Sequence, residues 1–269
     1  MLMVSVLMGV LCKSSRLPLL KEALDSLLSQ TFTDIEILIC DDGSDVDVCD
    51  HLNVAAQFDK RIKLVRSGKM ITLPQKLNFC LKYAGGNLIA RMDDDDFSYP
   101  DRFKEQVRFL DEHKDIAFVG CNVDLYDDGS IVGRRSFPEY PEASDFLFRQ
   151  PFIHPALMFR RSAFAAVGGY SEEKKNLFCE DYDILLRMYS AGLCGANIQK
   201  PLFRYTLSMT AKGRKKYRYR INEARTRFAR FRELGMLPGA MPYVIKPLIV
   251  GLIPNGILCH LRSRKDNRF

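Results

Sequence analysis

Short apolar runs alternate with amphipathic stretches over much of this 269-residue chain, and this alternation limits the folds open to it. Helical spacing of apolar residues follows Pro18, Leu73 and Pro100. Because alternating strands and amphipathic helices build βαβ units, we predict an α/β fold with a mostly parallel central sheet flanked by helices. Six runs are typical of its buried strands, at residues 4–9, 35–40, 62–65, 88–92, 116–123 and 156–159.

Charge divides the chain into an acidic body and a basic tail. Residues 212–269 hold 15 Lys and Arg against 3 Asp and Glu, a net charge of +12, whereas residues 1–211 carry a net charge of −5. Apolar residues of the tail recur at helical spacing, and basic residues repeat every seven positions on another face, at Arg218, Arg225 and Arg232. We therefore predict a C-terminal extension, residues 212–269, that contains a basic amphipathic helix.

Both ends of the chain contain apolar runs. Lys246 and several prolines interrupt the C-terminal run, whose longest stretch without a formal charge has 15 residues, 247–261. A membrane-spanning helix needs about 20 apolar residues, so we expect an interfacial or re-entrant segment there. The N-terminal run lacks the basic residues and cleavage site of a signal peptide, and we expect a buried strand. The eight cysteines form no C-x-x-C pair, which favours reduced, buried thiols and a cytoplasmic protein.

Acidic clusters follow two of the predicted strands. Asp41 and Asp42 end the second strand, although Asp-Asp-Gly-Ser is also a common turn sequence. Four aspartates, residues 93–96, end the fourth strand, where their mutual repulsion calls for a cation. Ligands of parallel α/β sheets bind at the carboxyl ends of strands, and hard divalent ions such as Mg2+ bind carboxylate and phosphate oxygens. We predict a metal and phosphate site at this second cluster.

Spacing alone leaves two other candidates open. Glu180 and Asp181 begin a predicted helix, where acids commonly cap the helix dipole but where one could also serve as a general base over a pocket. His154 lies in the sequence Pro-Phe-Ile-His-Pro, which is compatible with a structural or a functional role.

Five sequence blocks, taken in order, resemble family 2 glycosyltransferases with the GT-A fold. The resemblance covers about residues 3–208 and implies a GT-A catalytic domain at 1–211, with a nucleotide-binding half at about 1–125 and an acceptor half at about 126–211. The blocks are VSVLM, SLLSQTFTDIEILICDDGS, IARMDDDDFSYPDRFKEQ, PFIHPALMFRRSAFAAVGGY and CEDYDILLRM.

The resemblance assigns roles to individual residues. It implies that Asp42, with Asp41 beside it, contacts the nucleotide base. It makes Asp93-x-Asp95 the motif for Mn2+ or Mg2+ and the diphosphate, with Asp95 the direct ligand, and Asp94 or Asp96 could share that role. Asp181 matches the catalytic base, and the acceptor or diphosphate residues are Glu180 and His154. The other nucleotide-binding candidates are Gly9, Leu11, Asn78, Arg91, Asp93 and Asp94.

Two blocks depart from the family pattern. A Tyr-Asn pair often follows the first strand in the family, whereas this chain has Gly9-Val10-Leu11-Cys12. A late Tyr-Arg-x-His block is replaced by residues 205–208, Tyr-Thr-Leu-Ser. A diphosphate contact from that block would have to come from elsewhere, with Arg204 and Lys212 as candidates.

The resemblance implies an inverting transfer of a sugar from a nucleotide-diphosphate sugar, most commonly a UDP-sugar, to a polyprenyl diphosphate-linked saccharide of bacterial surface polysaccharide. The basic tail then predicts peripheral association with the anionic inner face of the cell membrane. One alternative is nucleic-acid binding through residues 214–220, which interleave basic and aromatic side chains. The acidic body argues against a nucleic-acid partner. The other alternative is a non-catalytic sugar-binding relative, which the presence of Asp95 and Asp181 disfavours.

Overall fold

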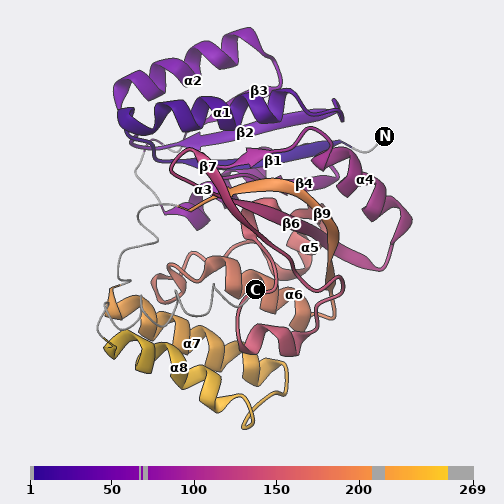
Figure 1. The fold of residues 1–269 in the computed structure, drawn as a ribbon, viewed down its shortest axis with the longest axis vertical. Helices are drawn as coiled ribbons and strands as arrows, with labels where there is room; N and C mark the ends of the chain where they lie inside the picture. Colours follow the sequence, from indigo (N-terminus) through magenta and orange to yellow (C-terminus); the bar gives the residue numbers. More distant parts are fainter. Residues whose placement is uncertain (1–2, 67, 69–71, 208–215, 254–269) are drawn as a thin grey trace.

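A computed structural model describes residues 3–66, 68, 72–207 and 216–253 of the chain. Figure 1 shows strands in the middle of the molecule, helices α1 and α2 along one side of β1–β3, and helices α7 and α8 at the opposite end. The helices are α1 (Leu17–Leu28), α2 (Val46–Phe58), α3 (Leu73–Tyr83), α4 (Arg102–Glu112), α5 (Arg161–Val167), α6 (Glu180–Ser190), α7 (Tyr217–Glu233) and α8 (Met241–Leu252).

One mixed sheet runs through the molecule in the order β3-β2-β1-β4-β8-β6-β9-β5, with β7 paired to β6. Strands β1–β4 are parallel, as predicted, whereas β8 is antiparallel to both of its neighbours, β4 and β6. The α/β fold is therefore confirmed. The strands are β1 (Val4–Val10), β2 (Ile35–Asp41), β3 (Ile62–Val65), β4 (Leu88–Arg91), β5 (Phe97–Ser98), β6 (Ile116–Asp127), β7 (Ser130–Arg135), β8 (Met158–Arg160) and β9 (Cys194–Thr206).

Strands β1, β2 and β4 are buried on both faces of the sheet. Successive side chains of a strand point to opposite faces, so Val6 and Met8 of β1 join one hydrophobic cluster and Leu7 joins another. The first cluster includes apolar residues of α1, α2 and α4, and the second includes residues of α3, α5 and α6. Burial on both faces explains why the first strands read as continuous apolar runs.

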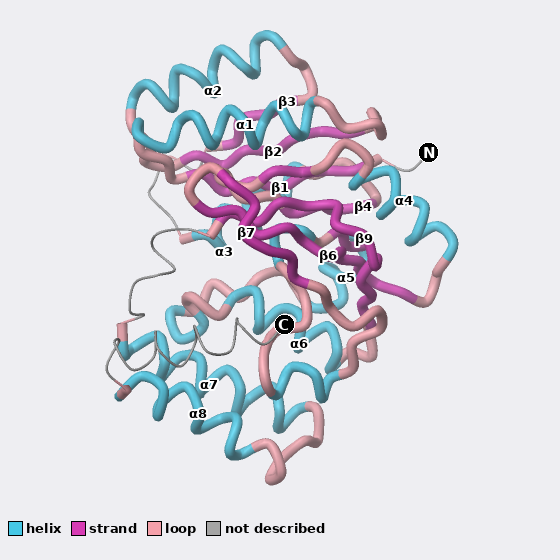
Figure 2. Tube along the Cα trace, viewed as in Figure 1, coloured by secondary structure: helices cyan, strands magenta, loops and turns pink. Residues whose placement is uncertain are grey.

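The C-terminal extension contains two helices, α7 and α8, that pack against each other, and α7 also packs against α6. Helix α7 confirms a basic helix within residues 212–269, although it buries Arg227 and Phe231 as well as small residues. Arg230 of α7 donates to Asp183 of α6 over 2.9 Å. Figure 2 shows α7 and α8 side by side below α6.

The apolar C-terminal run is helical over the part that the structure describes. Helix α8 has 12 residues and contains Pro247, and residues 254–269 lie outside the described residues. Among the described helices, none has the length and apolar composition needed to cross a bilayer. The described cysteines are all free thiols, five of them buried.

Candidate active site

The carboxyl ends of β1, β2 and β4 meet at one edge of the sheet. Val10 pairs with Asp41 in the β1–β2 register, and Leu7 pairs with Arg91 in the β1–β4 register. The two acidic clusters therefore follow β2 and β4, the strands on either side of β1, and lie at the same edge, as expected for a ligand site of an α/β sheet.

The first acidic cluster is held in place by loop hydrogen bonds. The hydroxyl of Ser44 donates to Asp41 over 2.5 Å and accepts from the backbone N–H of Cys12 over 2.8 Å, which ties the loop after β2 to the end of β1. Asp42 is buried beside Asp41. The backbone of Gly9 lies close to α3, since a Cβ there would come within 2.8 Å of Leu73 Cδ1. Leu11 is 54% exposed at the end of β1.

The second cluster, residues 93–96, carries its own counter-charges. Arg91 forms an ion pair with Asp93, and Arg16 lies 2.7 Å from Asp95 and 3.4 Å from Asp94. Burial, with the neighbouring carboxylates, raises the pKa of Asp94 to about 7 and raises that of Asp95 as well. A carboxylate cluster of this kind is stabilised by added positive charge.

Asp96 connects the aspartate cluster to strand β9. Its side chain is buried, one oxygen accepts the backbone N–H of Thr206 over 2.8 Å, and the other has no hydrogen-bond partner among the described residues. The hydroxyl of Thr206 donates to the backbone carbonyl of Asp95 over 2.5 Å. The last residues of β9 are therefore fastened to the aspartate loop.

The donor set suits a divalent cation that also binds a phosphate. No group of three or more His, Cys, Asp or Glu side chains that could enclose a metal occurs among the described residues. Mg2+ in nucleotide enzymes commonly takes only one or two carboxylates and completes its shell with phosphate oxygens and water. Asp95 already holds a cationic group, the guanidinium of Arg16, so the residues present fit such an ion.

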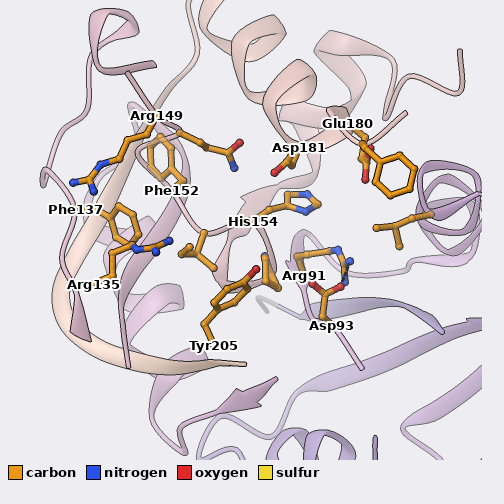
Figure 3. Close-up of a pocket in the computed structure, with 15 residues that line it drawn as sticks. Arg91, Asp93, Arg135, Phe137, Arg149, Phe152, His154, Glu180, Asp181 and Tyr205 are labelled. Atoms are coloured by element: carbon orange, nitrogen blue, oxygen red, sulfur yellow. Dashed lines mark hydrogen bonds and ion pairs between the residues drawn. The ribbon is translucent and has the colours of Figure 1, made fainter. Parts of the chain in front are cut away.

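A cavity of about 390 Å³ lies beside this cluster (Figure 3). Arg91 and Asp93 reach it from the end of β4, Glu180 and Asp181 from the first turn of α6, and Tyr205 from β9. The structure thus brings the predicted base and part of the predicted metal motif into one cavity. His154 lines it as well, together with the residues Arg135, Phe137, Arg149 and Phe152.

His154 is held as a neutral imidazole. It is buried, and its Nε2 lies 2.9 Å from the hydroxyl of Tyr170. Burial lowers the pKa of His154 well below its usual value, and the positive charge of Arg91 adds to this shift. A neutral ring can donate or accept a hydrogen bond in the cavity without adding charge.

The two acids that α6 contributes to the cavity, Glu180 and Asp181, differ in their surroundings. One carboxylate oxygen of Asp181 accepts the backbone N–H of Tyr182 over 2.8 Å. Burial raises the pKa of Glu180 to about 7, with a further contribution from Asp181. Glu180 Oε2 is buried and has no hydrogen-bond partner among the described residues. Burial therefore disfavours the charged form of Glu180 in this cavity.

Several predicted residues lie outside the cavity. The side-chain amide of Asn78 donates to the backbone carbonyl of Tyr170 and accepts its N–H, each over 2.9 Å, so it holds the loop that supplies the partner of His154. Arg204, considered for the diphosphate, packs between the rings of Phe97 and Tyr126 and pairs with Glu22 instead. Lys212 lies outside the described residues. Gly9, Leu11, Asp41 and Asp42 lie at the ends of β1 and β2 and do not line this cavity.

Three residues of the site were not predicted from the sequence: Arg16, Arg135 and Arg149. Each lies in a segment without a regular pattern, and each reaches the site only because distant segments meet there. Tyr205 was noticed only as part of a block that departs from the family pattern. Its position in the cavity follows from the attachment of β9 to the aspartate loop.

Relatives of this chain are found by sequence. "Putative glycosyltransferase EpsE" of Bacillus subtilis (strain 168) is 33% identical over 264 residues, which cover 97% of this chain and 94% of the relative. The "UDP-Gal:alpha-D-GlcNAc-diphosphoundecaprenol beta-1,3-galactosyltransferase" of Escherichia coli is 31% identical over 278 residues, covering 98% of this chain and 97% of the relative.

Solved structures share the fold at low sequence identity. The S. aureus TarS fragment 1–349 in complex with UDP-GlcNAc has a TM-score of 0.69 at 16% identity and covers 91% of this chain and 73% of its own. The mannosyltransferase PcManGT of Pyrobaculum calidifontis, in complex with GDP-Man and Mn2+, has a TM-score of 0.60 at 17% identity. The match covers 97% of this chain and 79% of the PcManGT chain.

The family model described as "Glycosyl transferase family 2" matches residues 10–168, more than half of the chain. The match spans both acidic clusters and His154. Together with the two relatives aligned along almost the whole length, it shows that this chain belongs to glycosyl transferase family 2.

Proposed function

We propose that this chain is an inverting glycosyltransferase of bacterial surface polysaccharide biosynthesis. In this proposal it moves a sugar from a UDP-sugar to a saccharide linked to a polyprenyl diphosphate. The observation that carries it is that Asp181, Asp93 and Arg91 line one and the same cavity. The printed name of the E. coli relative, which specifies a UDP-Gal donor and a diphosphoundecaprenol acceptor, supports both substrate classes.

The donor binds at the edge formed by β1, β2 and β4. Asp41 and Asp42 contact the base, and the diphosphate lies against residues 93–95. Asp95, with Asp93, would hold Mn2+ or Mg2+, and the ion would neutralise the diphosphate and improve it as a leaving group. Arg91 holds Asp93 in place through their ion pair. The donor half then corresponds to about residues 1–125 and the acceptor half to about 126–211.

Asp181 acts as the general base. It takes the proton from the acceptor hydroxyl, whose oxygen attacks the anomeric carbon from the face opposite the diphosphate. The new bond from oxygen to carbon forms as the bond from the anomeric carbon to the phosphate oxygen breaks, so the configuration inverts in one step. Neutral His154 lies in the same cavity and can hydrogen bond to the acceptor or to the diphosphate without repelling either.

Replacement of the base tests this function directly. Asp181→Asn should abolish sugar transfer from the UDP-sugar while leaving the Kd for UDP in Mn2+ unchanged, because the amide keeps the size of the side chain and cannot accept the proton. Asp111→Asn, on the exposed face of α4, is the matched control and should transfer at the wild-type rate. Transfer by Asp181→Asn at a rate near that of the wild type would remove Asp181 as the base.

A donor screen by thermal shift identifies the nucleotide and the sugar, since a ligand at 100 times its Kd stabilises the folded protein by about 2.7 kcal/mol.

We further propose that the protein is cytoplasmic and binds the anionic inner face of the cell membrane through α7 and α8. Arg218, Arg225 and Arg232 of α7 are exposed. Basic residues near an anionic surface contribute about 1 kcal/mol each. Large apolar side chains are exposed on the same two helices, at Phe228, Ile245, Ile249 and Leu252.

Charge reversal tests the membrane proposal without removing buried residues of α7. The triple variant with glutamate at positions 218, 225 and 232 should lose binding to vesicles that contain phosphatidylglycerol, measured by co-sedimentation. Neutral phosphatidylcholine vesicles control for non-specific adsorption. Unchanged binding of the triple variant to the anionic vesicles would show that these arginines do not attach the protein to the membrane.

A further inference from the structure

The cavity contains two arginines that the proposed chemistry does not use. Arg135, at the end of β7, and Arg149 both line it. Within residues 3–66, 68, 72–207 and 216–253, neither has a carboxylate at ion-pair distance. Arg91, the third arginine of the cavity, is paired with Asp93. Two cationic groups thus face the cavity with no negative partner from the described protein.

Their position separates them from the aspartate cluster. In Figure 3, Arg135 and Arg149 lie on one side of Asp181 and His154, and Arg91 and Asp93 lie on the other. Burial is the main cause that lowers the pKa of His154, and the charge of Arg91 adds to it. The charge of Arg135 acts instead on Tyr205, whose pKa it lowers against the larger, opposite effect of burial. The cavity therefore has two charged ends with the proposed base between them.

An inverting mechanism places the donor and the acceptor at opposite ends of the cavity. The nucleophile and the leaving group of a single displacement stand on opposite sides of the anomeric carbon. Since the diphosphate of the donor leaves toward the side of Asp93, the acceptor has to enter from the other side. The part of the acceptor beyond its reacting hydroxyl then extends toward Arg135 and Arg149.

We propose, resting on the function proposed above, that Arg135 and Arg149 form an acceptor subsite for phosphate. Its ligand is the diphosphate that joins the accepting sugar to its lipid. The planar guanidinium binds phosphate oxygens through two parallel hydrogen bonds, which makes arginine well suited to this ligand. Phe137 and Phe152, both buried, also line this cavity and add apolar atoms to the wall beside the accepting sugar. A carboxylate on the acceptor sugar would be recognised by the same groups, so the experiment includes both anions.

The experiment compares three acceptors with the variants Arg135→Gln, Arg149→Gln and the double variant. The acceptors are an N-acetylglucosaminyl α-diphosphate with a short alkyl chain, the neutral alkyl glycoside of the same sugar, and an alkyl glycoside of glucuronic acid. Loss of a charged hydrogen bond costs about 1.5–3 kcal/mol, so the double variant should raise KM for the diphosphate acceptor at least about tenfold. The kcat with that acceptor, KM for the neutral glycoside and the Kd for UDP should stay near their wild-type values.

Arg134→Gln is the matched control. Arg134 is the neighbour of Arg135 on β7, points to the opposite face of the strand, and pairs with Asp124 at 2.8 Å. This variant removes the same charge from the same strand and should leave KM for the diphosphate acceptor unchanged.

Four outcomes would overturn the subsite. An equal rise of KM for the neutral glycoside would indicate general damage to the cavity. Weaker UDP binding would place the arginines on the donor. A larger effect with the glucuronide would assign them to a carboxylate. Unchanged KM values in the double variant would remove both arginines from acceptor binding.

A direct titration keeps this proposal separate from the proposed function. If the wild-type protein transfers sugar to none of the acceptors, the proposed function fails for these substrates, and binding still tests the subsite. The diphosphate acceptor, titrated by calorimetry with UDP and Mn2+ present, should bind the wild-type protein at least about tenfold more tightly than the double variant. No detectable binding to the wild-type protein at millimolar concentration would overturn the subsite.

Discussion

Glu180 makes the stability of this protein depend on pH in a way that can be calculated. Burial, with the charge of Asp181, raises its pKa from 4.5 to about 7. One pKa unit corresponds to about 1.4 kcal/mol, so ionising Glu180 in the folded chain costs about 3 kcal/mol more than in the unfolded chain. Burial of the carboxyl group, one oxygen of which lacks a hydrogen bond among the described residues, is the largest source of this cost, and the charge of Asp181 adds to it.

The sign follows from proton linkage. Because the folded chain binds this proton more tightly than the unfolded chain, stability falls as pH rises through the range from 4.5 to about 7. The loss is complete above the folded pKa and absent below the unfolded one. Glu180→Gln cannot ionise, so its free energy of unfolding, minus that of the wild type, should be about 3 kcal/mol larger near pH 8 than near pH 4.

Urea unfolding at several pH values between these limits measures the difference. Glu173→Gln is the control, since the side chain of Glu173 is 60% exposed and only paired with Lys175. The control should show no comparable dependence on pH. A difference between Glu180→Gln and the wild type that is the same at all pH values would refute the reasoning, because it would mean that Glu180 ionises as easily in the folded chain as in water.

Three other substitutions have definite expected outcomes. Asp183→Asn should lower the free energy of unfolding by about 3 kcal/mol, because it removes the buried partner of two arginines, and a loss below about 1 kcal/mol in urea would contradict this. Asn78→Ala should cost about 1–3 kcal/mol in the same assay by leaving backbone groups of Tyr170 unpaired, and an unchanged midpoint would argue against the loop contact. Arg16→Ala should tighten Mn2+ binding without nucleotide, measured by electron paramagnetic resonance of the free ion, because a competing cation is removed from Asp95; equal affinity would contradict this.

The parallel half of the sheet was predictable from sequence because its strands are buried on both faces. Residues of β1 and β2 alternate between two hydrophobic clusters, so every position is apolar or tightly hydrogen bonded and the runs are easy to recognise. Helix α2 was missed, since Val48 and Leu52 are its only fully buried side chains and its apolar periodicity is weak. Strand β9 was missed because Gln199-Lys200-Pro201 interrupts it, at a place where its register with β6 shifts.

Part of the candidate site could likewise be predicted from the sequence, and part could not. The acidic clusters could be placed at one sheet edge because each directly follows a recognisable strand. The other end of the cavity could not be predicted, since Arg135 and Arg149 come from an edge strand and a loop that carry no periodic pattern. Asn78 shows the limit of motif reasoning: its position in a sequence block does not reveal that its amide is already bonded to the backbone of Tyr170.

The buried carboxylate of Asp183 has a mechanical consequence. It lies two residues after Asp181 in α6 and accepts from Arg187 over 2.8 Å and from Arg230 of α7 over 2.9 Å. The helix that carries the proposed base is therefore joined to the proposed membrane-binding helix through a buried carboxylate that both arginines contact. If α7 lies on the bilayer, the contact through Asp183 also fixes the distance of Asp181 from the lipid headgroups. The protein would then favour acceptor saccharides whose reacting hydroxyl lies at that distance from the membrane surface.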